Sequence, residues 1–280
     1  MPPPPEDRYV WVADVRARYW QVGSGGSPLI LLHGGMSSVE IWSYNLAALA
    51  EQHQVYALDM VGSGRSDKPE ADYTLAYQAD FLAGFMAALG IPTATLIGNS
   101  MGGGVALHLA LTQPERVERL VVVAGFGLGQ EIALPLRLAS LPGVGLLAVP
   151  TRWGASLSLR GNVVDRRIVP PEWVEWSYQK FGWPGSKTAA LRLAQTNLNL
   201  WGVKPQVYQP LLRQLPNLDL PTLLIWGSQD PILPLAHGKR AVALIPQARL
   251  RVFEECGHWP QVEKADQFNQ CVLDFLTEEG

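Results

Sequence analysis

Short apolar runs alternate with helical stretches along most of this chain, and this rhythm limits the folds that it can adopt. Six runs resemble PLILLHG: each is bounded by turn residues, which is typical of a strand buried on both faces. Strands that alternate with helices predict a mostly parallel sheet with helices on both faces. The six runs lie at 28–34, 54–60, 93–100, 116–125, 221–230 and 248–257.

Two further strands are predicted at the N-terminus. Residues 9–23, YVWVADVRARYWQVG, alternate in the manner of a β-hairpin that closes near Ala13 and Asp14. Helical spacing covers 37–52 and 74–90, and the second helix is expected to stop at Gly90. The chain is therefore predicted to have an α/β fold with an eight-stranded, mostly parallel sheet.

The alternation breaks in the middle of the chain. Residues 126–218 hold helical patches, prolines and five of the ten tryptophans, and no convincing buried strand. The strand–helix rhythm returns at Pro221. We therefore expect one core domain, formed by 1–125 and 219–280, with the helical segment 126–218 inserted between two strands of its sheet.

Composition excludes several classes of function. With a net charge of −3, the chain is not basic as nucleic-acid binders usually are. Its charges are scattered and form no block of like sign that would suggest a tail or a membrane-surface patch. No apolar run is long enough to span a bilayer, and MPPPPEDRYV does not resemble a signal peptide. Two cysteines, Cys256 and Cys271, do not suggest a disulfide framework. We therefore expect a cytoplasmic protein without a membrane span. No spacing of His or Cys residues predicts a metal site.

One strand-to-helix turn surrounds a serine with glycines. Gly98-Asn99-Ser100-Met101-Gly102 follows the pattern G-x-S-x-G. Side chains at Gly98 and Gly102 would collide with the neighbouring strand and helix. The helix that begins at Met101 directs its unpaired N–H groups toward the surroundings of the hydroxyl, which favours a developing oxyanion. Ser100 is therefore a candidate nucleophile.

A serine nucleophile needs a base and a group that orients the base. His258 directly follows the last predicted strand, and Asp230 directly follows the strand before it. Both lie at carboxyl ends of strands, where open α/β sheets bind their ligands. Asp230 is also compatible with a simple turn before Pro231. The order Ser100, Asp230, His258 nevertheless predicts a catalytic triad.

These motifs together resemble the α/β-hydrolase superfamily, in its serine-nucleophile branch, from about Tyr9 to Leu276. His33-Gly34-Gly35 is similar to the oxyanion loop of that family, and residues 59–66 are similar to its D-x-x-G-x-G-x-S turn. The resemblance implies that the backbone N–H groups of Gly35 and Met101 bind the oxyanion. It also implies that 126–218 forms a cap over the active site, that His33 braces its loop, and that no cofactor is needed.

Two activities compete within this branch. Asn99 before the serine and Trp259 after the histidine look like the meta-cleavage-product hydrolases, which split carbon–carbon bonds in ring-fission dienones. Those enzymes usually have a glycine- and proline-rich oxyanion loop, whereas this chain has Gly35-Met36-Ser37-Ser38. They also use a cap arginine for the acidic end of the dienone. None of the candidates sits in a matching motif: Arg152, Arg160, Arg166, Arg167 and Arg192.

Because the loop and the cap arginines depart from the pattern of those enzymes, the sequence favours hydrolysis of small to medium apolar carboxylic esters through an acyl-enzyme. Carbon–carbon hydrolysis is the alternative, and a non-catalytic small-molecule receptor or a perhydrolase is a third reading. Four residues are predicted to contact the substrate: Met36, Trp42, Asn99 and Trp259. Most tryptophans of the inserted segment are expected to pack it onto the sheet: Trp153, Trp173, Trp176, Trp183 and Trp201.

Overall fold

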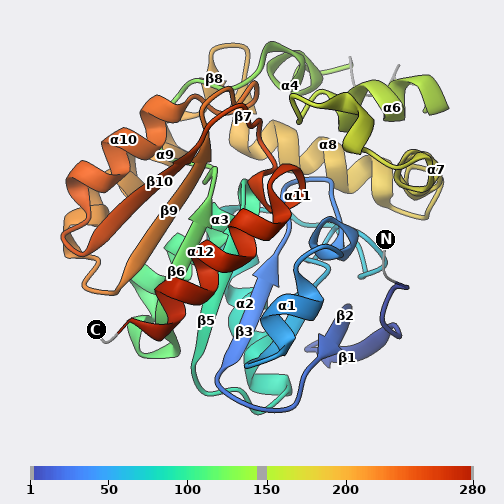
Figure 1. The fold of residues 1–280 in the computed structure, drawn as a ribbon. Coiled ribbons are helices and arrows are strands. Elements are labelled where there is room, and N and C mark those ends of the chain that lie inside the picture. The colour runs from blue at the N-terminus through green and yellow to red at the C-terminus, as the bar shows by residue number, and fades with distance from the viewer. Residues whose placement is uncertain (1–2, 144–149, 279–280) are drawn as a thin grey trace.

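The computed structural model describes residues 3–143 and 150–278. Its main sheet has eight strands in the order β1-β2-β4-β3-β5-β6-β9-β10. The first two strands pair antiparallel and the six from β4 to β10 are parallel, which confirms the predicted α/β sheet (Figure 1). The strands are β1 (Arg8–Val12), β2 (Val15–Val22), β3 (Pro28–Leu32), β4 (Gln54–Leu58), β5 (Ala94–Asn99), β6 (Val117–Val123), β9 (Thr222–Gly227) and β10 (Ala248–Phe253).

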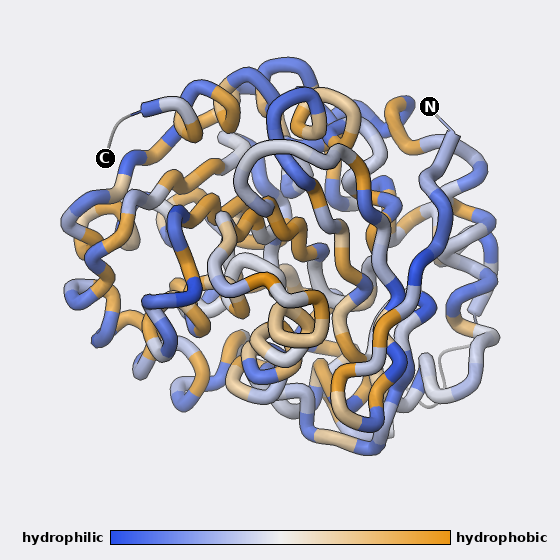
Figure 2. Tube along the Cα trace, turned by 90° about the horizontal axis from the view of Figure 1, so that it is seen from below, coloured by the Kyte–Doolittle hydropathy of each residue, from blue (hydrophilic) through white to orange (hydrophobic). Residues whose placement is uncertain are grey.

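Alternate side chains of the central strands enter two different cores. In β3, Ile30 and Leu32 pack with the helices on one face, whereas Leu29 and Leu31 pack with those on the other. One face is covered by α2 (Leu75–Ala88), α3 (Met101–Thr112) and α10 (Leu235–Leu244), and the other by α1 (Leu46–Ala50) and α12 (Ala265–Thr277). Figure 2 shows hydrophobic residues concentrated on the strands in the middle of the molecule and hydrophilic ones around them. Burial on both faces explains why these strands are continuous apolar runs.

The helix expected over 37–52 is interrupted. The structure has a 3-10 helix, η1 (Val39–Trp42), followed by the short α1. The Ser43 hydroxyl donates to the backbone oxygen of Glu40 at 2.7 Å, and the Asn45 side-chain amide donates to the backbone oxygen of Gln261 at 3.0 Å. The expectation of one helix over 37–52 was therefore wrong in its length, since the structure has two short helices there.

Between β6 and β9 the chain leaves the main sheet. It forms α4 (Leu134–Ala139), α6 (Arg152–Arg160), α7 (Pro171–Lys180), α8 (Ser186–Asn197), a pair of two-residue strands, β7 (Leu198–Asn199) and β8 (Gly202–Val203), and α9 (Pro205–Gln214). The helices α4, α6, α7 and α8 lie across one end of the sheet (Figure 1). Within the part that the structure describes, no helix is both long and apolar enough to cross a membrane.

Strand register brings the predicted motifs to that same end. Leu32 pairs with Leu58 on one side and with Gly98 on the other. The residues that follow these three positions are therefore neighbours at the carboxyl edge of the sheet: His33, Asp59 and Asn99. The fold thus gathers the oxyanion loop, the D-x-x-G-x-G-x-S turn and the serine turn beneath the inserted helices.

Candidate active site

Ser100 lies in a sharp turn between β5 and α3. Its backbone adopts φ 53° and ψ −117°, a conformation that non-glycine residues rarely take. The turn is held because the Ser100 N–H donates to the Val123 oxygen at 2.8 Å and the Phe126 N–H donates to the Ser100 oxygen at 2.9 Å. A strained backbone that its neighbours determine in this way is characteristic of a functional position.

The flanking glycines are required by contact, as the sequence predicted. A Cβ on Gly98 would lie 2.4 Å from the backbone of Gly102, and one on Gly102 would lie 2.4 Å from the backbone oxygen of Leu32. The atoms in the way belong to the backbone, which cannot move aside as a side-chain end can. Strand, turn and helix therefore pack at a separation that only glycine allows.

Gly102→Ala is expected to lower the free energy of unfolding by about 3 kcal/mol, since overpacking of this kind costs roughly 1–3 kcal/mol and here the obstacle is backbone. Urea denaturation of both proteins measures the change. Gly25→Ala is the matched control, because a Cβ there meets nothing within 4 Å. Equal stability of the two variants would contradict the close packing of the turn.

Asp230 and His258 meet directly. His258 Nδ1 lies 2.8 Å from Asp230 Oδ2, and both side chains are buried. The other carboxylate oxygen of Asp230 accepts the N–H groups of Ile232 and Leu233 at 2.8 and 2.9 Å. Asp230 therefore stabilises the turn with one carboxylate oxygen and pairs with His258 through the other. The two roles that the sequence allowed for it do not exclude each other.

The two ring nitrogens of His258 differ in their hydrogen-bond partners. A carboxylate on Nδ1 selects the tautomer with hydrogen on Nδ1 and a lone pair on Nε2. Among the described residues, Nε2 makes no hydrogen bond. Asn99, next to Ser100, donates its side-chain amide to the backbone oxygen of His258 at 3.2 Å, which ties the histidine loop to the serine turn. The free lone pair of Nε2 can accept a proton from a nucleophile at this end of the sheet.

The oxyanion loop lies against the serine turn. A Cβ on Gly34 would lie 3.2 Å from Ser100 Cβ, and one on Gly35 would lie 3.8 Å from Met101 Cβ. Gly35 and Met101, the two residues expected to supply N–H donors, are therefore neighbours. Leu193 of α8 covers Gly35 from the other side, with its Cδ2 3.3 Å from the same Cβ position. The inserted helices thus close over the place where an oxyanion would form.

His33 braces this loop from within. Its Nε2 accepts the Met60 N–H at 3.1 Å, so its Nδ1 carries the hydrogen and donates to the Gly34 oxygen at 2.7 Å. Burial lowers the pKa of His33, because desolvation penalises the charged imidazolium more than nearby Asp59 favours it. His33 is therefore neutral and structural.

This histidine predicts a loss of stability in acid. The unfolded chain binds a proton at the ordinary pKa of 6.5, whereas the folded His33 resists it, so stability is lost as the pH falls below that value. The Tm should drop between about pH 7 and pH 5, and drop less in His33→Gln, whose amide can make both bonds without titrating. Buried His237 also has a lowered pKa and acts in the same direction in both proteins. An identical drop in both proteins would contradict this role.

The D-x-x-G-x-G-x-S turn is structural. Asp59 accepts the N–H groups of Val39 and Arg65 and the guanidinium of Arg18 at 2.8, 2.8 and 3.0 Å. A Cβ on Gly64, which has φ 52°, would overlap the Asp59 carboxylate. The turn therefore wraps around a buried carboxylate, and this carboxylate also holds the segment after the oxyanion loop.

The four residues predicted to contact substrate have different environments. Met36 is exposed and lines a cavity. Asn99 is buried, and its side-chain amide donates to the backbone oxygens of His258 and Val123. Trp42 is fully buried on the sheet face below, against Phe268, so the structure does not bring it to the cavity. Trp259 packs against Trp173, with ring centroids 6.2 Å apart.

Only part of the tryptophan prediction agrees with the structure. Trp173 is buried, whereas Trp153 and Trp201 are 76% and 72% exposed. Helical spacing alone does not distinguish the inner from the outer face of an inserted segment, because that segment has no continuous sheet to define its inner side.

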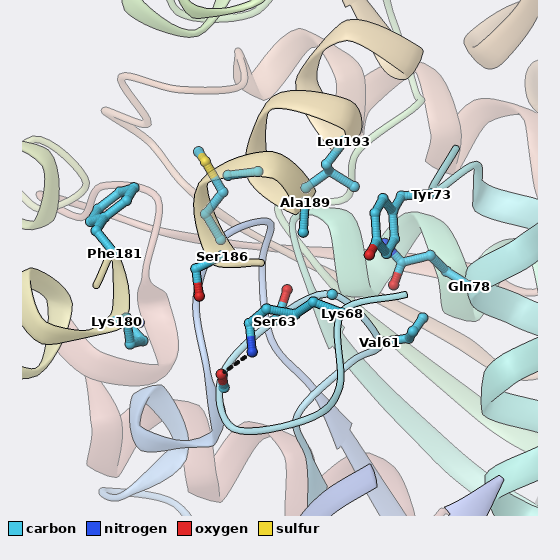
Figure 3. A pocket seen from close by; sticks show the side chains of 14 residues that line it. Val61, Ser63, Lys68, Tyr73, Gln78, Lys180, Phe181, Ser186, Ala189 and Leu193 are labelled. Carbon is cyan, nitrogen blue, oxygen red and sulfur yellow. Dashed lines mark hydrogen bonds between the residues drawn. The ribbon is translucent and has the colours of Figure 1, made fainter. Parts of the chain in front are cut away.

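Met36 lines a cavity, and Figure 3 shows the other side chains around it. Its walls come from the segment 61–68, the start of α2 and the helices α7 and α8. The sequence reasoning missed its polar residues: Ser63, Lys68, Gln78, Lys180 and Ser186. Ser63 lies within the motif at 59–66 and Lys68 follows it by two residues, so these two positions carried a signal. The described residues include no group of His, Cys, Asp and Glu side chains suited to a metal ion.

Comparisons with known proteins agree with the fold. A family model described as alpha/beta hydrolase fold matches residues 27–265. The chain is 34% identical to a 2-hydroxymuconate semialdehyde hydrolase of Pseudomonas sp. (strain CF600), over 97% of this chain and 94% of that protein. A solved meta-cleavage product hydrolase of Pseudomonas fluorescens IP01 is 30% identical with a TM-score of 0.82, over 96% and 97% of the two chains. A solved membrane phospholipase A is 28% identical with a TM-score of 0.80, over 97% and 85%.

Proposed function

This chain belongs to the alpha/beta hydrolase family, and we propose that it hydrolyses a carbon–carbon bond beside a ketone in dienone ring-fission products. The observation that carries the proposal is its similarity, along nearly the whole chain, to hydrolases of such compounds. Asn99, which precedes the nucleophile, and Trp259, which follows the base, also favour this reaction. The preference for esters rested on the loop Gly35-Met36-Ser37-Ser38 and on the lack of a cap arginine in a matching motif, and the relatives favour the alternative instead.

The mechanism follows from the site. Ser100 attacks the ketone carbon while His258 Nε2 takes the hydroxyl proton, and the N–H groups of Gly35 and Met101 stabilise the oxyanion. Collapse of this intermediate breaks the carbon–carbon bond. Its electron pair enters the conjugated system, and His258 returns the proton to carbon. A water, deprotonated by His258, then releases the acid from Ser100, while Asp230 stabilises the imidazolium in each half of the reaction.

Carboxylic ester hydrolysis is the second candidate. It requires the same triad and oxyanion hole without an electron sink in the leaving group. The similarity to a phospholipase A, together with the Met36-Ser37-Ser38 loop, favours it. Fold alone does not separate the two reactions, because function lies in the site.

Paired steady-state kinetics tests the proposal. One substrate is a coloured dienone followed by its bleaching, and the other is a series of p-nitrophenyl esters of increasing acyl length. A kcat/KM for the dienone above that for every ester supports carbon–carbon hydrolysis, and the reverse order supports an esterase. Background rates for both, with thermal stabilisation by the dienone, would indicate a receptor.

A further inference from the structure

A second cavity lies between the helices α2, α3, α8 and α9. Its volume is about 330 Å³, which is enough for a small organic molecule, since a cavity of about 150 Å³ can hold benzene. It shares no lining residue with the cavity of Figure 3, and Ser100 does not line it. We call it the α9 cavity, because that helix contributes the largest share of its wall: Gln206, Val207, Pro210, Leu211 and Gln214.

The wall of the α9 cavity combines apolar and neutral polar side chains. Leu75 of α2 and Leu111 of α3 join the apolar residues of α9. Among the described residues that line it, none is Asp, Glu, Lys or Arg, and His108 is the only titratable one. Burial lowers the pKa of His108 more than nearby Asp80 raises it, so the imidazole is neutral at pH 7. A charged ligand would have no counter-ion in this wall, which favours an uncharged one.

Asn197, at the end of α8, has an unused acceptor. The residue is 1% exposed, and its Nδ2 donates to the backbone oxygens of Tyr73 and Leu193 at 3.1 and 2.8 Å. These two bonds fix the orientation of the amide, so its oxygen is directed away from both carbonyls. Among the described residues, Asn197 Oδ1 has no hydrogen-bond partner. Buried amide oxygens usually have one, so a donor is missing at this wall.

The helix α9 supplies a second unused acceptor. Pro210 lies inside this helix and has no N–H, so it cannot donate to the backbone oxygen of Gln206 four residues earlier. Gln206 and Pro210 both line the cavity. Two helices of the wall therefore lack a donor, and a ligand that donates hydrogen bonds would complement them.

Asn197 also belongs to the partition between the two cavities. Tyr73 and Leu193, whose backbone oxygens accept its amide, line the cavity of Figure 3. Tyr73 has φ 46°, a strained value for a bulky residue, and the bond from Asn197 helps to hold it. A ligand bound to Asn197 is therefore one residue away from the wall of the active site without entering it.

We propose that the α9 cavity is a second binding site, separate from the one at Ser100, for a neutral molecule that carries a hydroxyl group on an apolar body. The body packs between α2, α3 and α9. The hydroxyl donates to Asn197 Oδ1 and supplies the hydrogen bond that this buried oxygen lacks. The site does not depend on which bond Ser100 cleaves.

Three fluorescent naphthalenes test the chemistry of the ligand. 2-Naphthol carries the donor, 2-methoxynaphthalene has the same rings without it, and 2-naphthoate carries a negative charge. The protein is titrated into each compound, and the fluorescence anisotropy of the compound reports binding. 2-Naphthol is expected to bind with a Kd below about 1 mM, about tenfold or more below the Kd of the other two. Equal affinities of 2-naphthol and 2-methoxynaphthalene, or no binding of 2-naphthol, would refute the proposal.

Substitutions at exposed positions test the location. Ala76 of α2 lines the cavity, so Ala76→Trp should obstruct it and raise the Kd of 2-naphthol about tenfold or more. Ala87→Trp is the matched control, since Ala87 is exposed on the same helix and does not line the cavity. It should leave the Kd unchanged. If Ala76→Trp does not fold, Gln206→Trp on α9 serves the same comparison.

Ala190→Trp separates this site from the active site. Ala190 lines the cavity of Figure 3, so a tryptophan there crowds the active-site side and should leave the Kd of 2-naphthol unchanged. A Kd that Ala190→Trp raises and that neither Ala76→Trp nor Gln206→Trp changes would place the ligand beside Ser100 and refute the second site. None of these titrations uses hydrolysis, so this proposal and the proposed function can fail independently.

Discussion

Ser100→Ala is expected to reduce kcat for the best substrate by about 10⁴-fold or more, which leaves only what the oxyanion hole and binding contribute. The reason is the geometry of the turn: Ser100 is held at φ 53°, beside Gly34 and at the start of α3. Alanine can keep the backbone bonds to Val123 and Phe126 but has no oxygen to attack a carbonyl. Stopped assays with purified variant and wild type measure the difference.

The control for this experiment is Ser158→Ala, which removes a hydroxyl from α6 in the inserted segment. It should retain wild-type kcat, and both variants should retain the wild-type circular dichroism spectrum. A Ser100→Ala enzyme that keeps more than about a tenth of wild-type activity would show that another nucleophile or a directly activated water performs the reaction.

Asp230→Asn is expected to lower kcat by roughly 10⁴-fold with the fold intact. The amide oxygen can still accept the N–H groups of Ile232 and Leu233, so the loop should keep its shape. An amide facing His258 Nδ1 favours the other tautomer, with hydrogen on Nε2, and this tautomer cannot take the serine proton. The loss therefore appears in kcat at neutral pH rather than in the Tm.

Asp219→Asn is the matched control, since Asp219 is exposed and accepts only from the side chain of Gln247 among the described residues. It should leave kcat unchanged. If Asp230→Asn were as active as Asp219→Asn, a different acid would have to orient His258. The residues that follow β6, Ala124 and Gly125, offer no carboxylate at the other plausible position.

The eight strands were predictable because each is a local pattern. A strand buried on both faces must be apolar throughout. A run such as PLILL or TLLIWG can therefore be recognised as a strand without knowing which strands lie beside it. The helix over 37–52 was less predictable. At its interruption, Asn45 donates to Gln261 and Asn269, more than 200 residues away along the chain, and no local pattern records these contacts.

The approach of Asp230 and His258 was predictable for a related reason. Parallel strands place their carboxyl ends at one edge, so polar residues directly after three strands are brought close by topology alone. The hydrogen bond between Asp230 and His258 agrees with that expectation. Trp42 was not predictable, since its sequence position beside the oxyanion loop does not say which sheet face receives its ring.

By itself the sequence determined the sheet, the serine turn and the order of the candidate triad, because these depend on periodicity, glycine contacts and strand ends. Only the tertiary structure decided which polar groups share a cavity. Lys68 and Lys180 lie in segments without a common motif, and both line one cavity because α7 packs across the end of the sheet. Desolvation of a charge depends on everything packed around it, and no local pattern along the chain records that environment.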